Sequence, residues 1–154
     1  MWSTACSRQT GQYPPELRER AARLKRQFNE QFWLPDRGYY AIALDRKKRP
    51  VDACASNMGH CLLFGIIDED KAPLVVERLM SREMFSGWGV RTLASDMGAY
   101  NPASYHNGSV WPHDSALIAF GLRRYGFDED FTLIFDGLLE AASRVSVTDQ
   151  CQPR

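Results

Sequence analysis

Between Ser86 and Gly126 the chain reads SGWGVRTLASDMGAYNPASYHNGSVWPHDSALIAFGLRRYG, and this stretch says most about the architecture. Residues 84–112 hold six glycines and prolines in 29 positions, which is incompatible with a helix. A loop of this length inside a compact domain is usually functional or disordered. Disordered segments are poor in aromatic residues, whereas this one contains Trp88, Tyr100, Tyr105 and Trp111. The sequence therefore predicts an ordered loop that carries function.

Helical patterns lie on both sides of this loop. Residues 15–33 predict an amphipathic helix whose apolar stripe is Leu17, Ala21, Leu24, Phe28 and Phe32. Two shorter helices are predicted next: residues 59–66, capped by Ser56 or Asn57, and a segment that Asp68 caps and that ends near Met80. After the loop, residues 112–125 and 128–143 predict two more helices, with Gly126 ending the first.

The remaining segments lack helical periodicity. Residues 38–52 predict a β-hairpin or an extended loop around the turn DRKKRP, and residues 145–154 predict an irregular tail. The order is then helix, hairpin, helix, helix, long loop, helix, helix. Such an order predicts a mainly α chain built of antiparallel helix pairs, joined at one end by elaborated loops.

Length and composition exclude several classes of protein. The 154 residues, 44% apolar and 25% charged, suit one soluble domain, and 19 basic residues offset 19 acidic ones. We therefore expect no nucleic-acid binding through bulk positive charge. No apolar run approaches the roughly 18 residues that span a bilayer, so we expect no membrane partner. The four cysteines form no Cys-x-x-Cys pair, which predicts reduced thiols and a cytoplasmic location: Cys6, Cys54, Cys61 and Cys151.

The polar and aromatic residues of the loop suit a sugar ligand. A pyranose ring has an apolar face that packs on a flat aromatic ring, and its hydroxyl groups need paired donors and acceptors. Trp88 and Trp111 offer such flat rings. The polar partners would be Arg91, His106, Asn107, His113 and Asp114.

Structural roles for the same residues stay open at this point. The two tryptophans could instead fill the end of a helical bundle, and Asp114 could cap the free N–H groups of the helix that begins beside it. A metal site is not predicted, because His60, His106 and His113 show no His-x-x-x-His spacing and no Cys-x-x-Cys pair joins them. Phosphate-binding and nucleophile-elbow motifs are also missing from the sequence, so no cofactor is predicted.

Three segments resemble a known family. They are FNEQFWLPDRGYYAIALD (28–45), SNMGHCLLFGII (56–67) and the run from Phe85 to Gly126, with its GWG-x-RTL and YHNGSVWPHD motifs. Together they resemble the bacterial glycogen-debranching, amylo-alpha-1,6-glucosidase-like glycoside hydrolases. That group shares an (α/α)6 toroid with the glucosidase I and mannosylglycerate hydrolase relatives. The resemblance covers about residues 16–143.

The resemblance implies a partial (α/α)6 toroid made of antiparallel helix pairs, with residues 1–154 as a single segment of a six-hairpin catalytic domain. Residues 1–14, like the tail, would be irregular. The ligand would be an α-glucoside or a related sugar, bound by the loop from Ser86 to Asp114. The residues that match by position, with substrate-contacting roles, are Trp88, Arg91, Tyr105, His106, Trp111, His113 and Asp114.

The resemblance also implies that this chain lacks the catalytic carboxylate pair. In the family the general acid is an Asp upstream of the matching segment, and the general base is a Glu in a Pro-Glu-Leu stretch shortly after it. We therefore expect an incomplete or split enzyme, inactive alone, whose uncovered helix faces favour association. A non-catalytic carbohydrate-binding remnant and a purely structural helical domain are the alternatives.

Overall fold

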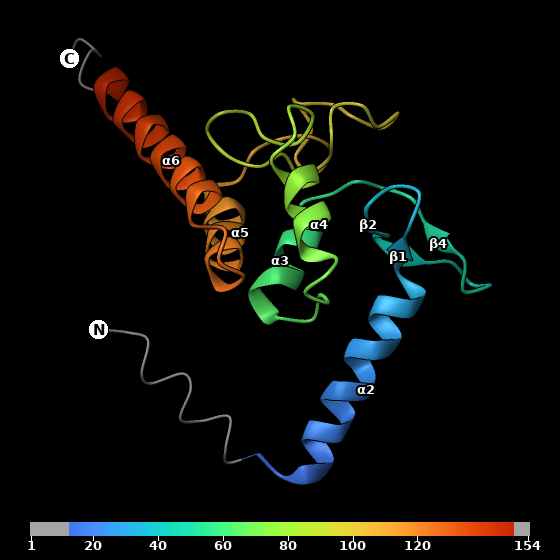
Figure 1. The fold of residues 1–154 in the computed structure, drawn as a ribbon. Coiled ribbons are helices and arrows are strands. Elements are labelled where there is room, and N and C mark those ends of the chain that lie inside the picture. Colours follow the sequence, from blue (N-terminus) through green and yellow to red (C-terminus); the bar gives the residue numbers. More distant parts are fainter. Residues whose placement is uncertain (1–12, 150–154) are drawn as a thin grey trace.

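The helices lie in the order that the sequence predicts, in a computed structural model that describes residues 13–149 (Figure 1). They are α2 (Pro15–Gln31), α3 (Asn57–Phe64), α4 (Ala72–Leu79), α5 (Pro112–Arg124) and α6 (Asp128–Asp149). Two short antiparallel hairpins separate α2 from α3: β1 (Trp33–Leu34) with β2 (Tyr39–Tyr40), and β3 (Ala43–Leu44) with β4 (Pro50–Val51). The described part of the chain is therefore mainly α, as predicted.

The core lies where α5 packs against α3 on one side and α6 on the other. Residues 125–127 join α5 to α6, and Gly126 within this turn has a φ of 84°, a left-handed conformation that favours glycine. The chain can therefore reverse within three residues and form a helical hairpin. Fully buried side chains come from α3, α4, α5 and α6: Leu62, Val75, Leu79, Ile118, Leu122 and Ile134.

Two glycines let α3 and α5 approach each other closely. A Cβ atom on Gly59 would lie 2.5 Å from Cγ1 of Ile118, and one on Gly121 would lie 2.7 Å from the backbone nitrogen of Leu63. A side chain at Gly59 would displace the side chain of Ile118, and one at Gly121 would displace the backbone of α3. This contact fixes how the two helices are placed along each other.

Helix α2 points away from the other helices (Figure 1). Its predicted apolar stripe is covered only at the C-terminal end, where Phe28 and Phe32 pack against the core. Leu17 and Leu24, nearer the N-terminus, are exposed. The predicted position of this helix is confirmed, although it ends at Gln31. Half of its apolar face lies on the surface of the described residues.

Asn29 joins α2 to the body. It is buried, and its amide nitrogen donates to the carbonyl oxygens of Lys25 and Ile66, both at 2.8 Å. Its side-chain oxygen accepts hydrogen bonds from the hydroxyl of Tyr40 and, at 3.1 Å, from the backbone nitrogen of Asp68. One side chain thus connects α2, β2 and the segment before α4.

The hairpin predicted for residues 38–52 is present as β3 and β4, with Lys48 at a φ of 61° in the turn. The β1–β2 pair was not predicted, because Trp33 continued the helical pattern of the preceding residues. The structure ends the helix before it, and Trp33 pairs with Tyr40. Pro35, which follows β1, is incompatible with a continuing helix.

Two predicted boundaries are wrong. Asp68 does not cap α4, because residues 68–71 first form a turn in which the Asp68 carbonyl accepts hydrogen bonds from the nitrogens of Lys71 and Ala72. The helix begins at Ala72 after Lys71. The tail predicted to be irregular from residue 145 is helical as far as Asp149, because α6 continues. The tail residues 150–154, and residues 1–12 of the other predicted irregular segment, lie outside the described residues.

The long loop between α4 and α5 is held by backbone pairs. Isolated antiparallel bridges join Ala55 to Leu93, Phe85 to Val90, and Arg91 to Val110. The loop is ordered, as predicted, because these pairs satisfy backbone groups that a loose loop would leave to water. In the described part of the chain, no helix is both long enough and apolar enough to cross a membrane.

Candidate functional site

A cavity of about 380 Å³ opens between the long loop and the N-terminal ends of α3 and α5. Its volume is within the range of small-molecule sites. Ser56, Asn57 and His60 reach it from the start of α3, and Thr92 from the loop. Four of the seven predicted site residues also line it: His106, Trp111, His113 and Asp114.

Aromatic rings form one wall of this cavity. The ring of Trp111 lies 5.4 Å from that of His106 and 5.2 Å from that of His113, between centroids. The ring of Tyr105, which is largely exposed, lies 4.5 Å from that of Trp111, between centroids. The indole nitrogen of Trp111 donates to the Ser109 hydroxyl at 3.0 Å, which fixes the plane of the ring.

Asp114 faces His60 across the base of the cavity. Nε2 of His60 lies 2.5 Å from Oδ1 of Asp114, without the alignment of a hydrogen bond, and Oδ2 is buried without a hydrogen-bond partner. The predicted capping role of Asp114 is wrong: Trp111 precedes α5 and no side chain caps it. Asp114 is instead the third residue of α5, where its carboxylate faces α3.

Trp88 and Arg91 lie apart from this group. They line a second cavity of about 370 Å³, with Tyr100 and, from α6, Leu138 and Ala141. The turn that carries Trp88 lies directly on α6, where a Cβ atom on Gly137 would be 2.5 Å from the carbonyl oxygen of Gly87. The structure therefore divides the predicted site residues between two cavities.

Neither tryptophan of the loop belongs to the core of the described residues. Trp88 is 48% exposed, and the guanidinium of Arg144 lies over its ring at 5.7 Å. Trp111 is half-buried beside the larger of the two cavities. The alternative in which both indoles fill the end of a bundle is therefore wrong.

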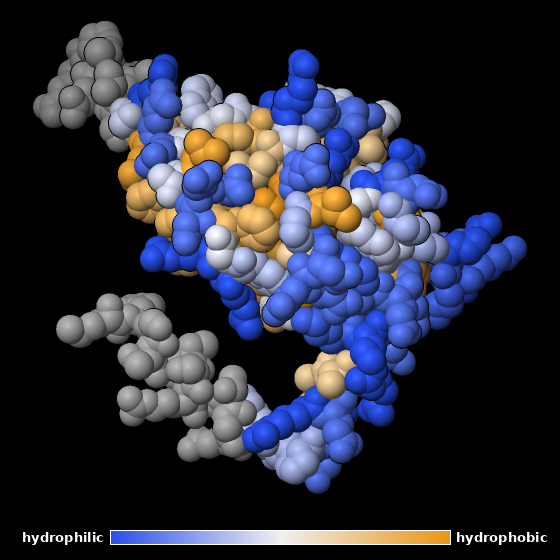
Figure 2. Space-filling model, in the orientation of Figure 1, coloured by the Kyte–Doolittle hydropathy of each residue, from blue (hydrophilic) through white to orange (hydrophobic). Residues whose placement is uncertain are grey.

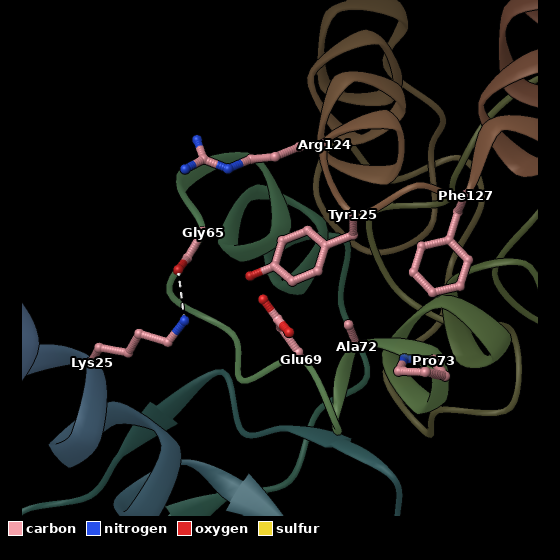
Figure 3. Close-up of a pocket in the computed structure, with 8 residues that line it drawn as sticks. All are labelled: Lys25, Gly65, Glu69, Ala72, Pro73, Arg124, Tyr125 and Phe127. Carbon is pink, nitrogen blue, oxygen red and sulfur yellow. Dashed lines mark hydrogen bonds between the residues drawn. The ribbon is translucent and has the colours of Figure 1, made fainter. Parts of the chain in front are cut away.

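A wider cavity of about 630 Å³ lies between α2 and the turn after α5, and Figure 3 shows eight residues that line it. Three of its polar side chains donate hydrogen bonds to backbone carbonyl groups. Lys25 donates to the carbonyl of Gly65 at 3.1 Å, Arg124 to that of Leu63 at 3.0 Å, and Tyr125 to that of Ile67 at 2.7 Å. These bonds tie α2 and α5 to the end of α3, which is a structural role.

Burial makes Cys54 and Cys61 poor nucleophiles. Burial raises the pKa of the Cys61 thiol to about 11, and burial also raises the pKa of Cys54. Both are free thiols, and at neutral pH each is protonated and unreactive. Among residues 13–149 no group of three or more histidine, cysteine or acidic side chains is placed to hold a metal ion. Cys6 and Cys151 lie outside the described residues.

His60, Asn57 and Thr92 were not among the predicted site residues. Asn57 and His60 stand three positions apart at the start of α3, so one face of that helix presents both. Thr92 accepts a hydrogen bond from the nitrogen of Gly108 at 2.9 Å and donates to the carbonyl of Ser109 at 3.1 Å. The spacing Asn-x-x-His was the available signal for the first two.

Comparison with known families shows to which family the chain belongs. Residues 4–151 match the family described as the mannosylglycerate hydrolase MGH1-like glycoside hydrolase domain. The chain belongs to this family. Comparison with curated proteins returned no match.

Solved structures share the fold. The GH63 mannosylglycerate hydrolase from Thermus thermophilus in complex with glucose is 22% identical, with a TM-score of 0.63 over 75% of this chain. The same enzyme in complex with Tris has the same identity and TM-score. An uncharacterized conserved protein from Thermus thermophilus is 21% identical, with a TM-score of 0.57 over 68% of this chain.

The match covers only part of those structures: 29%, 28% and 26% of their chains, respectively. This chain thus spans less than a third of each of them. The prediction of a partial toroid of the mannosylglycerate hydrolase type is confirmed at the level of the fold.

Proposed function

We propose that the chain supplies the sugar-binding part of the pocket of a glycoside hydrolase of the mannosylglycerate hydrolase type. The single observation that carries this proposal is the cavity beside Trp111, with polar side chains around one exposed aromatic wall. Such a wall suits the apolar face of a pyranose, and His106, Asn107 and His113 suit its hydroxyl groups. The ligand is an α-linked glucoside or mannoside.

The catalytic carboxylate pair belongs elsewhere in this proposal. Hydrolysis of a glycoside by this type of chemistry needs two carboxyl groups on either side of the bond. Among the described residues that line the cavity, Asp114 is the one carboxylate, and it faces His60. The chain is therefore expected to bind a sugar without cleaving its glycosidic bond.

The proposal also includes the larger domain to which the chain belongs. Residues 1–154 are one segment of a six-hairpin catalytic domain, which is supported by the 29% of the Thermus enzyme that the match covers. Amylo-alpha-1,6-glucosidase activity in glycogen debranching is a narrower alternative that rests on the sequence motifs alone. The free thiols of Cys54 and Cys61 suit a cytoplasmic location.

Tryptophan fluorescence of the 154-residue chain tests the proposal. Glucose and mannose are titrated separately, and we expect a saturable change with at least one of them. Trp111→Ala should weaken that binding about tenfold, because the sugar loses its stacking surface. Phe64→Ala, which removes an exposed aromatic ring outside the cavity, is the matched control.

A hydrolysis assay completes this test. Mannosylglycerate and glucosylglycerate are incubated with the chain, and we expect no release of free sugar. The absence of any saturable fluorescence change with either hexose would overturn the proposed binding site. Turnover that Asp114→Asn abolishes would instead show that a catalytic carboxylate lies in this cavity.

A further inference from the structure

We infer that His60, rather than Asp114, is the group of this pair that contacts the sugar, and that Asp114 is the positioning residue behind it. The inference rests on the proposed function, because it names a further ligand-contacting residue of the same cavity. From the sequence alone, His60 had no predicted role, since it was considered only as a metal ligand and that function was rejected, and Asp114 was predicted to contact substrate.

Burial separates the roles of the two side chains. The side chain of Asp114 is 9% exposed, whereas that of His60 is 34% exposed. Oδ2 of Asp114 is buried, and Oδ1 is covered by the imidazole at 2.5 Å. Nε2 of His60 is itself buried. A ligand in the cavity therefore meets the remaining atoms of the imidazole before it meets the carboxylate.

The charge of Asp114 determines which ring nitrogen of His60 can accept a hydrogen bond. A carboxylate beside Nε2 favours the tautomer with its proton on Nε2, as in other carboxylate–histidine pairs. Nδ1 then carries a lone pair and accepts hydrogen bonds. Nδ1 makes no hydrogen bond with any other described residue, so it is available to a hydroxyl group. The ligand class is a neutral polyhydroxylated ring, whose hydroxyl groups donate.

The packing of α3 against α5 holds His60 and Asp114 next to each other. His60 follows Gly59, whose missing side chain lets α3 contact Ile118 closely. Asp114 lies four residues before Ile118, on the same face of α5. The crossing of the two helices thus places the carboxylate against the imidazole. The same crossing keeps the ring at the edge of the cavity without any hydrogen bond from the described residues of the loop.

Nitrogen NMR of the histidine side chains tests this inference directly. The chain has three histidines, so the signals can be assigned with single His→Gln variants. On titration with the hexose that changes the fluorescence, the Nδ1 signal of His60 should shift with the same saturation curve. Without sugar, Asp114→Asn should move the His60 signals and leave those of His106 near their original positions.

Binding by variants gives the second readout. His60→Ala should weaken hexose binding about five- to tenfold, the usual cost of one hydrogen bond to a ligand. His60→Gln should restore most of it, since its amide can donate to Asp114 and accept from the sugar. Thermal unfolding of both variants shows whether the fold is kept.

The outcomes separate this inference from the proposed function. Saturable fluorescence with an unchanged Nδ1 signal of His60 would overturn the inference and leave the sugar site in place. Equal binding by wild type and a folded His60→Ala would do the same. If neither hexose changes the fluorescence, the proposed function and this inference are both overturned.

Discussion

Gly121 lies at the crossing of α3 and α5, where a methyl group would be 2.7 Å from the backbone nitrogen of Leu63 and 3.0 Å from the carbonyl of Gly59. Backbone atoms cannot turn aside as a flexible side chain can. Gly121→Ala should therefore lower the free energy of unfolding by about 2 kcal/mol, in the range of overpacked cores. Urea denaturation measures this change.

Gly98→Ala is the matched control, because a Cβ atom there has no neighbour within 4 Å. It should change the free energy of unfolding by less than about 0.5 kcal/mol. Equal stability of the two variants would mean that the helices can separate at Gly121 without cost.

For single residues, the sequence predicted which residue types line the cavity better than it predicted which side chains contact one another. Trp111 and His113 are close together in the chain, so their proximity follows from local structure. His60 meets Asp114 only because α3 packs against α5, and no local pattern carries that information. Arg91 was expected beside Trp111, yet its bridge to Val110 leads its side chain to the other cavity.

Among the elements, α2 is attached to the body by Lys25, by the rings of Phe28 and Phe32, and by the buried side chain of Asn29. Asn29 makes hydrogen bonds to Tyr40, Ile66 and Asp68. Asn29→Leu would leave these buried groups without partners, which should cost about 2 to 3 kcal/mol. Amide hydrogen exchange should then speed up throughout α2 more than in α5.

Gln27→Leu, on the exposed side of the same helix, is the control and should leave exchange in α2 unchanged. If exchange in α2 is the same in Asn29→Leu and wild type, the stacked rings of Phe28, Phe32 and Tyr40 hold the helix without the asparagine.

Element positions were predictable where periodicity and helix-ending residues agree. The helix α5 begins at Pro112 and is followed by Gly126, as expected from the pattern. The errors fall where a boundary depends on tertiary contacts. The strand β1 forms because Trp33 pairs with Tyr40, and α6 extends past Ser143 although its last residues show no apolar periodicity.

For the whole molecule, apolar side chains gather over α5 and α6 (Figure 2). Phe120 and Phe135 are exposed on either side of Phe131, whose ring lies 6.4 Å from the first and 5.9 Å from the second. Exposed apolar patches favour association. We expect the chain to associate as its concentration rises, measured by sedimentation velocity.

The double variant Phe120→Ser/Phe135→Ser should weaken this association, since both rings are already in contact with water and little folding free energy is lost. Leu74→Ser, an exposed apolar residue on α4, is the control. Unchanged association in the double variant would place the contact on another face, such as the exposed stripe of α2.

The absence of a side chain at Gly137 sets the width of the cavity between Trp88 and α6. The turn of residues 86–89 rests on α6 at Gly137, and the opposite walls of that cavity come from the turn and from Leu138 and Ala141. Any larger substituent at position 137 would act as a spacer between the two walls. The gap would then widen by the thickness of that spacer, while the cavity at Trp111, which no residue of α6 lines, would keep its dimensions.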